Sequence, residues 1–381
     1  MEFKQLLALM SEKKASDMFV TAGWPPSIKV DGVIHPIGSK PLTPTQTAEL
    51  VTGVMNDKQR LEFEKTNECQ FAISARGIGR FRVSAFIQRD AAGMVLRRIE
   101  TRIPTIDELR LPEILREVAM TKRGMVIFVG GTGTGKSTSL AALVGYRNRH
   151  STGHIITIED PIEFMHEHDG CIITQREVGV DTESFEVALK NTLRQAPDVI
   201  LIGEIRTRQT MEYAIAFSET GHLVLATLHA NNANQAIDRI INFFPEEARA
   251  QLFMDLSLNL KGVIAQQLIP RHNGQGRCAA IEILLNTPLA ADIIRKGEVY
   301  KLKELMKRSR EQGMITFDQA LFALQQQGEI SYEDALKHAD SANEVRLMIK
   351  LQGQDDLSKI GQDLDGISLV EQDDGEPHVR L

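Results

Sequence analysis

A glycine-rich octapeptide is the segment whose residue types and spacing point most directly to chemistry. Residues 130–137 read Gly-Gly-Thr-Gly-Thr-Gly-Lys-Ser and fit the pattern G-x-x-x-x-G-K-[ST]. Glycines let backbone N–H groups curl around phosphate oxygens in conformations that a Cβ atom would obstruct. In this pattern Lys136 reaches the β- and γ-phosphates of ATP, and the Ser137 hydroxyl is a ligand for Mg²⁺. The predicted nucleotide-binding residues are Gly130, Gly131, Thr132, Gly133, Thr134, Gly135, Lys136, Ser137 and Thr138.

A carboxylate follows the apolar run Val199–Ile202, as a phosphate site of this kind requires. Gly203-Glu204 ends the run and resembles a Walker B strand, except that Gly203 stands where an aspartate is usual. Glu204 would then act on Mg²⁺ through water, or on the attacking water itself. A helix-capping role for this acid is the alternative.

Three more acids follow a second apolar run. Glu159, Asp160 and Glu163 lie just beyond Ile155–Ile158, with Pro161 ending the strand. Ligands of parallel sheets bind at the carboxyl ends of the strands, so we expect these acids to face the phosphates. One of them can polarise the attacking water, and a solvated acidic loop is the alternative.

Two histidines, His222 and His229, flank the apolar run Leu223–Leu228. Their spacing suits no common metal pair. Only one of them can lie at the carboxyl end of that strand, so geometry favours His229 as a direct phosphate contact. A structural role is the alternative for each histidine.

From about residue 113 onward, apolar runs alternate with helical patterns, which predicts a parallel sheet covered by helices on both faces. The glycine-rich segment lies between the apolar run Met125–Val129 and the helical pattern Ser137–Arg147. That context favours a binding site over a purely structural loop. Further helical patterns cover Ser184–Arg194, Arg208–Thr220 and Ala233–Phe243, and only helical patterns follow residue 287.

The sequence divides into four parts. Residues 1–100 combine short apolar runs and turn signals with two helical patterns, Glu2–Lys14 and Pro44–Asn56, which predicts a small α+β domain. Residues 101–112 carry two prolines and are predicted to be a linker and hinge. Residues 113–345 form the predicted ATPase domain with its helical C-terminal part, and residues 346–381 an acidic, disordered tail.

The charge balance argues against a nucleic-acid partner. The 381 residues carry a net charge of −7, and the last 31 residues hold eight acids and two bases, which leaves −1 for the rest. A nucleic-acid binder is usually basic.

No apolar run approaches the roughly 18–20 residues of a membrane span. The N-terminus does not resemble a signal peptide, and the three scattered cysteines predict idle thiols in a reducing cytosol.

Four segments in order, 130–138, 156–164, 200–206 and 220–229, resemble the motifs of the secretion-superfamily ATPases. Within that superfamily the chain is similar to the type IV pilus retraction motors, the PilT/PilU group, over about residues 1–345. The resemblance implies a RecA-like P-loop ATPase domain, a smaller N-terminal PAS-like α+β domain and a helical C-terminal region.

The resemblance also implies roles for individual residues. Glu163 would be the general base and Glu204 the Walker B glutamate, with Glu159 and Asp160 as further candidates for holding Mg²⁺. His222 and His229 would sense the γ-phosphate. Arginines of the N-terminal domain reach the nucleotide in this family, and the matching region offers Arg82 and Arg97.

The family works as a homohexameric ring in the cytoplasm, peripherally associated with an inner-membrane platform protein at the pilus base. The resemblance therefore implies ATP-driven pilus retraction and twitching motility. A four-cysteine zinc insertion typical of the extension ATPases is absent, which favours retraction. A divergent segment at 288–298 and the extra tail are more similar to the accessory PilU branch, which implies a paralogous ATPase as partner. The alternatives are a hexameric nucleic-acid-processing ATPase and a non-hydrolytic nucleotide-binding regulator.

Overall fold

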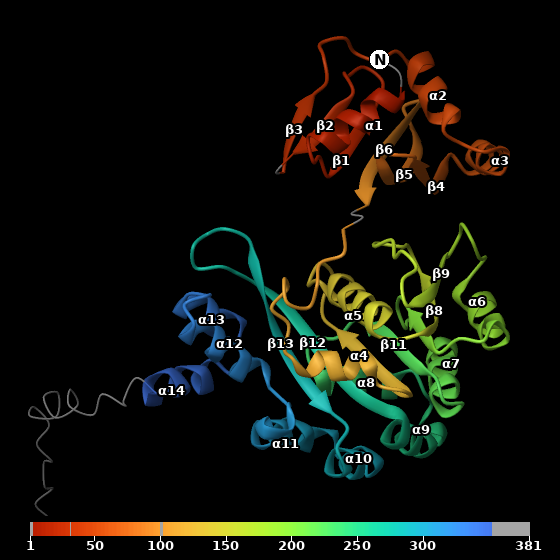
Figure 1. The fold of residues 1–381 in the computed structure, drawn as a ribbon. Coiled ribbons are helices and arrows are strands. Elements are labelled where there is room, and N and C mark those ends of the chain that lie inside the picture. Colours follow the sequence, from red (N-terminus) through yellow and green to blue (C-terminus); the bar gives the residue numbers. More distant parts are fainter. Residues whose placement is uncertain (1–2, 31, 100–101, 353–381) are drawn as a thin grey trace, which may run out of the picture.

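The computed structural model describes residues 3–30, 32–99 and 102–352 and arranges them around two separate sheets (Figure 1). The N-terminal sheet has the order β3-β2-β1-β6-β5-β4, with antiparallel neighbours. Its strands are β1 (Asp17–Val20), β2 (Ser27–Val30), β3 (Val33–Pro36), β4 (Glu68–Ala75), β5 (Gly79–Gln88) and β6 (Ala91–Ile99). Its helices are α1 (Phe3–Glu12), α2 (Pro44–Gly53) and α3 (Asp57–Thr66). Apolar side chains of the helices and strands share one core, as expected for an α+β unit.

The second sheet has the order β13-β12-β7-β11-β10-β8-β9. Its neighbours are parallel except β12 and β13, which form an antiparallel hairpin. The strands are β7 (Gly124–Val129), β8 (Gly153–Glu159), β9 (Cys171–Glu177), β10 (Val199–Ile202), β11 (Leu223–Leu228), β12 (Leu260–Pro270) and β13 (Arg277–Leu285). The parallel pairing brings the carboxyl ends of β7, β11, β10 and β8 to one edge.

Helices cover both faces of this sheet. They are α4 (Ile114–Met120), α5 (Lys136–His150), α6 (Phe185–Thr192), α7 (Arg208–Glu219), α8 (Ala233–Asn242) and α9 (Glu246–Asn259), with a 3₁₀ turn at Leu193–Gln195. Along β7, Ile127 packs into one core with α6 to α9, and Phe128 packs into the other with α4 and α5. Burial on both faces explains why this strand is a continuous apolar run rather than an alternating one.

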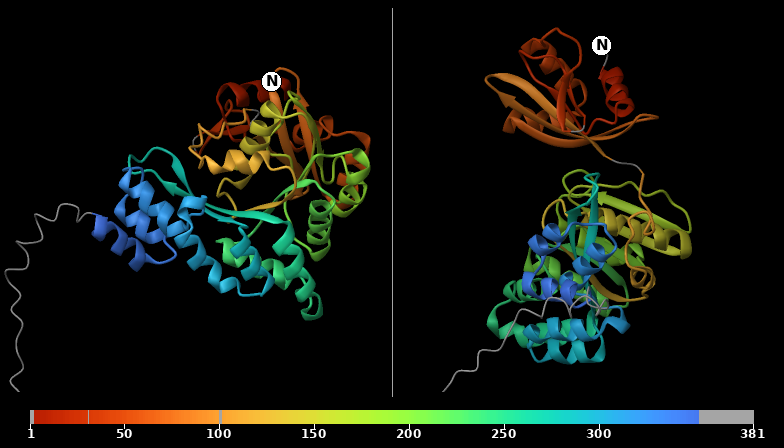
Figure 2. Two further views of the ribbon diagram at one scale, coloured as in Figure 1. Left: turned by 60° about the horizontal axis from the view of Figure 1, so that its bottom comes forward. Right: turned by 90° about the vertical axis from the view of Figure 1, so that its left-hand side faces the viewer.

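Five short helices follow β13: α10 (Pro288–Arg295), α11 (Leu302–Arg308), α12 (Phe317–Gln326), α13 (Tyr332–His338) and α14 (Ala342–Gln352), with 3₁₀ turns at Val299–Lys301 and Arg310–Gln312. They lie together on one side of the sheet (Figures 1 and 2). α14 continues past the domain boundary predicted at residue 345, because Val345 is buried in the core beside α12 and α13. The rest of the predicted tail, 353–381, lies outside the described residues.

The predicted linker is partly attached to the second domain. Ile106 and Leu111 are buried in the core that also contains Leu115 of α4. Packing therefore holds the second half of this segment against the second sheet. Thr101 lies outside the described residues. Among the described helices, none is long and apolar enough to cross a membrane.

Candidate active site

The glycine-rich loop joins β7 to α5, so it lies at the carboxyl edge of the second sheet. Gly130 and Gly135 have φ angles of 152° and 86°. A Cβ atom on Gly130 would lie 2.6 Å from the carbonyl oxygen of Gln266, and one on Gly135 would lie 2.7 Å from Nε2 of Gln266. Both backbone conformation and close packing therefore require glycine at these two positions.

Lys136 is folded back beneath this loop. Its Nζ donates hydrogen bonds to the carbonyl oxygens of Gly130 (2.9 Å) and Gly131 (2.7 Å). Burial lowers the pKa of this ammonium group, and the negative charge of Glu204 opposes that shift. The loop thus presents a cation at the N-terminus of α5, where a phosphate group would bind.

Gln266 clamps the loop from the neighbouring strand β12, and the sequence analysis missed it. The residue is 2% exposed. Its Nε2 donates to the carbonyl oxygen of Thr134 (2.9 Å), and its Oε1 accepts from Oγ of Ser139 on α5 (2.7 Å). One amide therefore joins the loop to the helix that follows it. A polar side chain inside an apolar strand is the signal that identifies such a residue.

Glu204 and His229 come together at the same edge, as the positions of β10 and β11 in the sheet require. Oε1 of Glu204 lies 3.0 Å from Nε2 of His229, and its Oε2 accepts from Nε of Arg206 (2.7 Å). Arg206 in turn lies 3.7 Å from Oδ2 of Asp160. A histidine and an arginine thus contact the two oxygens of this carboxylate, whose negative charge also acts on Lys136.

Packing around position 203 explains why a glycine stands there in place of the usual aspartate. A Cβ atom here would lie 3.0 Å from Cα of Glu159 and 3.1 Å from the carbonyl oxygen of Ile158. Those atoms belong to β8, which pairs with β10 in parallel. Close packing between the ends of the two strands therefore disfavours a side chain at this position.

The acids at and after the end of β8 occupy two different environments. Glu159 accepts hydrogen bonds from Thr157 Oγ1 (2.6 Å) and Gln175 Nε2 (3.3 Å), and burial raises its pKa. Glu163 is 46% exposed and its Oε1 lies 3.3 Å from a guanidinium nitrogen of Arg82. An arginine of the N-terminal sheet therefore contacts the predicted general base directly.

A second arginine of β5 also crosses between the domains. Arg80 lies 3.2 Å from Oε2 of Glu177, and their side chains are only 17% and 5% exposed. The same carboxylate oxygen accepts the backbone N–H of Ile162, in the turn that carries the acids (3.3 Å). This ion pair, which the sequence analysis missed, fixes the N-terminal domain next to that turn.

Two predicted residues are not brought to the phosphate loop. Nε of Arg97 donates to Oδ1 of Asp17 (2.8 Å), a residue on the neighbouring strand of its own sheet. His222 precedes β11 and lies at the amino edge of the sheet, where its Nδ1 is 3.1 Å from the carbonyl oxygen of Phe217. The length of a strand, about 20 Å at 3.3 Å per residue, separates it from the loop.

Two hollows flank the loop. One, of about 400 Å³, is bounded by Gly130, Gly131, His229 and the side chains of α8 that include Asp238 and Arg239. The other, of about 600 Å³, lies beside Thr138. Its lining includes Lys14 and Arg98 of the N-terminal domain and Arg102 of the segment that follows this domain. The site is therefore open on both sides of the phosphate loop, and one side is basic.

The residues predicted to hold Mg²⁺ offer oxygen ligands, which that ion prefers. Within the described ranges, no group of three or more His, Cys, Asp or Glu side chains could hold a metal ion. Mg²⁺ usually keeps several waters and binds to one or two protein oxygens plus the phosphates of the substrate. The hydroxyl of Ser137 is the candidate for a direct ligand, and the carboxylate of Glu204 is the candidate for a contact through water.

Comparisons with known proteins agree with this geometry. Residues 3–327 match the family described as "Type II/IV secretion system protein". The chain is 68% identical to the type IV pilus ATPase PilU of Pseudomonas aeruginosa over 374 residues, 98% of each chain. It is 43% identical to PilT of the same organism, a type IV pilus retraction ATPase, over 89% of this chain and 98% of that one.

A solved structure extends the likeness to three dimensions. The crystal structure of the pilus retraction motor PilT with bound ADP superposes with a TM-score of 0.85 at 37% identity. It covers 90% of this chain and 98% of that chain. The predicted fold class, a RecA-like ATPase domain with a smaller N-terminal domain and a helical C-terminal region, is thereby confirmed.

Proposed function

Because the chain belongs to the type II/IV secretion system family, and within it to the PilT/PilU pilus ATPases, we propose that it is a Mg²⁺-dependent motor, or accessory motor, of type IV pilus retraction. The convergence of Lys136, Glu204 and His229 at one sheet edge carries the proposal. This constellation lies in a chain that matches a pilus ATPase over nearly its whole length.

Phosphate binding rests on the loop and on α5. The backbone N–H groups at the start of the helix and the ammonium of Lys136 would hold the β- and γ-phosphates, with phosphate oxygens replacing the two carbonyls that Lys136 now contacts. Ser137 would hold Mg²⁺, and Glu204 would contact it through water. Bound Mg²⁺ would neutralise negative charge on the phosphates. Glu159 and Asp160 are further candidates, although Glu159 is already hydrogen-bonded to Thr157 and Gln175.

Glu163 is the proposed general base, and its contact with Arg82 links the chemistry to domain movement. While the guanidinium lies 3.3 Å from Glu163, the ion pair occupies that carboxylate. Movement of the N-terminal domain that carries Arg82 toward the γ-phosphate would free Glu163 to accept a proton from water. The same movement would bring a positive charge to the transferring phosphoryl group.

His229 is the proposed sensor of the γ-phosphate, through its contact with Glu204. Neither His222 nor Arg97 lies beside the loop in this chain, so any role for them requires a neighbouring subunit or a domain rotation. Such a subunit is expected, because the proposed assembly is a homohexameric ring. In this proposal the ring acts in the cytoplasm on an inner-membrane platform protein, together with a paralogous ATPase.

The test uses cells that lack this protein, cells that lack the paralogous ATPase, and cells that lack both. Each strain receives the wild-type chain or the Glu204→Ala variant, and pilus retraction is scored by twitching. The proposal predicts that the wild-type chain restores retraction in at least one background and that Glu204→Ala does not. Equal rescue by both would refute the motor function, because the variant lacks the carboxylate proposed to act on Mg²⁺.

A further inference from the structure

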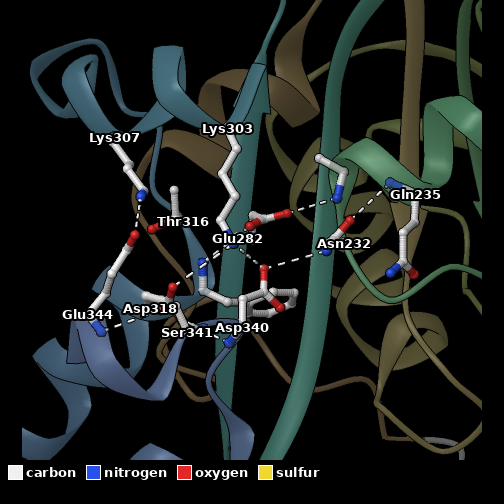
Figure 3. A network of polar contacts seen from close by, with 12 residues as sticks. Asn232, Gln235, Glu282, Lys303, Lys307, Thr316, Asp318, Asp340, Ser341 and Glu344 are labelled. Atoms are coloured by element: carbon white, nitrogen blue, oxygen red, sulfur yellow. Dashed lines mark hydrogen bonds and ion pairs between the residues drawn. The ribbon is translucent and has the colours of Figure 1, made fainter. Parts of the chain in front are cut away.

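Glu282, in the middle of β13, binds the first turns of two helices with one carboxylate (Figure 3). Its Oε1 accepts the backbone N–H of Ala233, the first residue of α8 (2.8 Å). Its Oε2 accepts the backbone N–H of Phe317, the first residue of α12 (3.2 Å). The residue is 2% exposed. A buried carboxylate is costly unless it is hydrogen-bonded, so both bonds matter to it.

The contacts continue from α12 to the last described helix. Asp318, on the first turn of α12, is 1% exposed and accepts the backbone N–H groups of Asp340 (2.8 Å) and Ser341 (3.2 Å), just before α14. Asp340 accepts from Nζ of Lys303 (2.8 Å) and from Nδ2 of Asn232 (3.4 Å). A polar network therefore joins the N-termini of α8, α12 and α14.

The N-terminus of α8 leads straight to the phosphate site. Asn232 is the N-cap of α8 and follows His229 by three residues. Further along the helix, Asp238 and Arg239 line the same hollow as Gly130 and Gly131 of the glycine-rich loop. Fixing the backbone N–H of Ala233 therefore fixes both the segment that carries His229 and one wall of this hollow.

We propose that Glu282 is a positioning residue for ATP hydrolysis, which holds α8 and the His229 segment in register with the C-terminal helices α12–α14. One carboxylate cannot follow two helix ends that move apart by more than a hydrogen bond tolerates. Displacement of the C-terminal helices, by a partner or a neighbouring subunit, therefore alters the contact between His229 and Glu204. This inference rests on the proposed ATPase function of the site and adds a route by which that site is regulated.

The test replaces the carboxylate with an amide of nearly the same shape, Glu282→Gln, in the full chain. The amide oxygen can accept only one of the two N–H groups, while its NH₂ faces the other. The control is Thr316→Ala, because the Thr316 hydroxyl accepts the N–H of Gln319 (3.3 Å) and so caps α12 without touching α8. Steady-state ATP turnover and hydrogen exchange over residues 233–242 are measured for both variants.

We expect Glu282→Gln to lower kcat at least about fivefold with KM for ATP within about twofold, because the phosphate loop itself is untouched. Exchange over α8 rises in the same variant. Thr316→Ala keeps kcat within about twofold of wild type and leaves α8 exchange unchanged. A purely structural role for Glu282 would instead lower the melting temperature of both variants and leave kcat of the folded protein the same.

A second variant, Asn232→Ala, weakens the N-terminus of α8, because the Asn232 side chain accepts the backbone N–H of Gln235 (2.9 Å). This variant is expected to lower kcat in the same way. Its kcat tests the proposal if Glu282→Gln does not fold. Turnover of Glu282→Gln within about twofold of wild type, or an equal loss in Thr316→Ala, would overturn the proposal. Absence of hydrolysis by the wild-type chain would instead refute the proposed function.

Discussion

At the scale of single residues, Gly203 shows how one backbone position shapes the phosphate site. The missing side chain allows the ends of β10 and β8 to approach closely, and the next residue, Glu204, contacts His229 and acts on Lys136 through its negative charge. The departure from the usual aspartate is therefore compatible with an active site in which Glu204 is the acid.

Gly203→Ala should destabilise the protein by about 1–3 kcal/mol, because backbone atoms of Glu159 and Ile158 must yield to the new methyl group. Turnover should fall as well, since Glu204 moves with the strand end. Gly53→Ala is the matched control, as a Cβ there meets nothing within 4 Å. Chemical denaturation of the two variants tests this, and equal stability of both would contradict it.

Glu282 makes stability depend on pH in a defined direction. Burial raises its pKa from 4.5 to about 7; Asp340 adds to the shift, while Lys303 and the N–H groups of Ala233 and Phe317 oppose it. Between these two pH values the folded chain holds a proton that the unfolded chain has lost. The contribution of Glu282 to stability therefore falls as pH rises from about 4.5 to about 7.

The Glu282→Gln variant lacks this titration. Compared with wild type by thermal denaturation, it should gain in relative stability between pH 5 and pH 8. Comparing the two proteins at each pH cancels the titration of every other group. A stability difference that stays constant over this range would show that Glu282 does not titrate in it.

The sequence predicted the residues of the glycine-rich loop because their chemistry depends on a local pattern, and the structure places that loop between β7 and α5. It also placed His229 correctly at the carboxyl edge, because strand direction alone decides that. Gln266, Arg80 and Glu282 were missed for one physical reason. Each acts through a partner far away along the chain, such as the pair of Arg80 with Glu177, and no local spacing records such a partner.

At the scale of elements, β5 connects the two domains. Arg80 and Arg82 both reach across to the second domain, to Glu177 and Glu163. The first pair is more buried than the second, so the first is suited to anchor the domain and the second to change partners during turnover.

Arg80→Met should lower the free energy of unfolding by about 1–3 kcal/mol, because Glu177 would remain buried without its cation. Arg208→Met, at an exposed pair with Glu212, should change it by less than about 0.5 kcal/mol. Denaturation curves for both variants provide the comparison. A smaller effect of Arg80→Met than of Arg208→Met would show that the interdomain pair does not anchor the domain.

The strands β10 and β11 have the bounds that the apolar runs predicted, since burial on both faces leaves a continuous apolar signal. The β12–β13 hairpin escaped notice. Gln266 and Gln267 interrupt β12, and Glu282 interrupts β13, so neither strand is uniformly apolar. Two of these interruptions, Gln266 and Glu282, are the residues that bind the glycine-rich loop and the two helix ends.

At the scale of the whole molecule, the net charge lies mainly beyond the described helices. Residues 353–381 contain eight acids and two bases, whereas α14 ends at Gln352 and completes the packed helical region. Removing residues 353–381 should leave ATP turnover within about twofold of the full chain, because solvated charges are screened within about 10 Å at 0.1 M salt. Steady-state kinetics of the truncated protein test this, and a larger loss would assign the segment a role in the motor.

The central claim is that this chain hydrolyses ATP at the site built around Lys136, and phosphate release by the purified full chain tests it most directly. Wild-type protein with ATP and Mg²⁺ is compared with Lys136→Ala, whose folding is checked by thermal denaturation. The account predicts sustained phosphate release by wild type and a loss of at least about 100-fold in the folded variant. Folded wild-type protein that releases no phosphate, or a Lys136→Ala variant that matches it, would contradict the account.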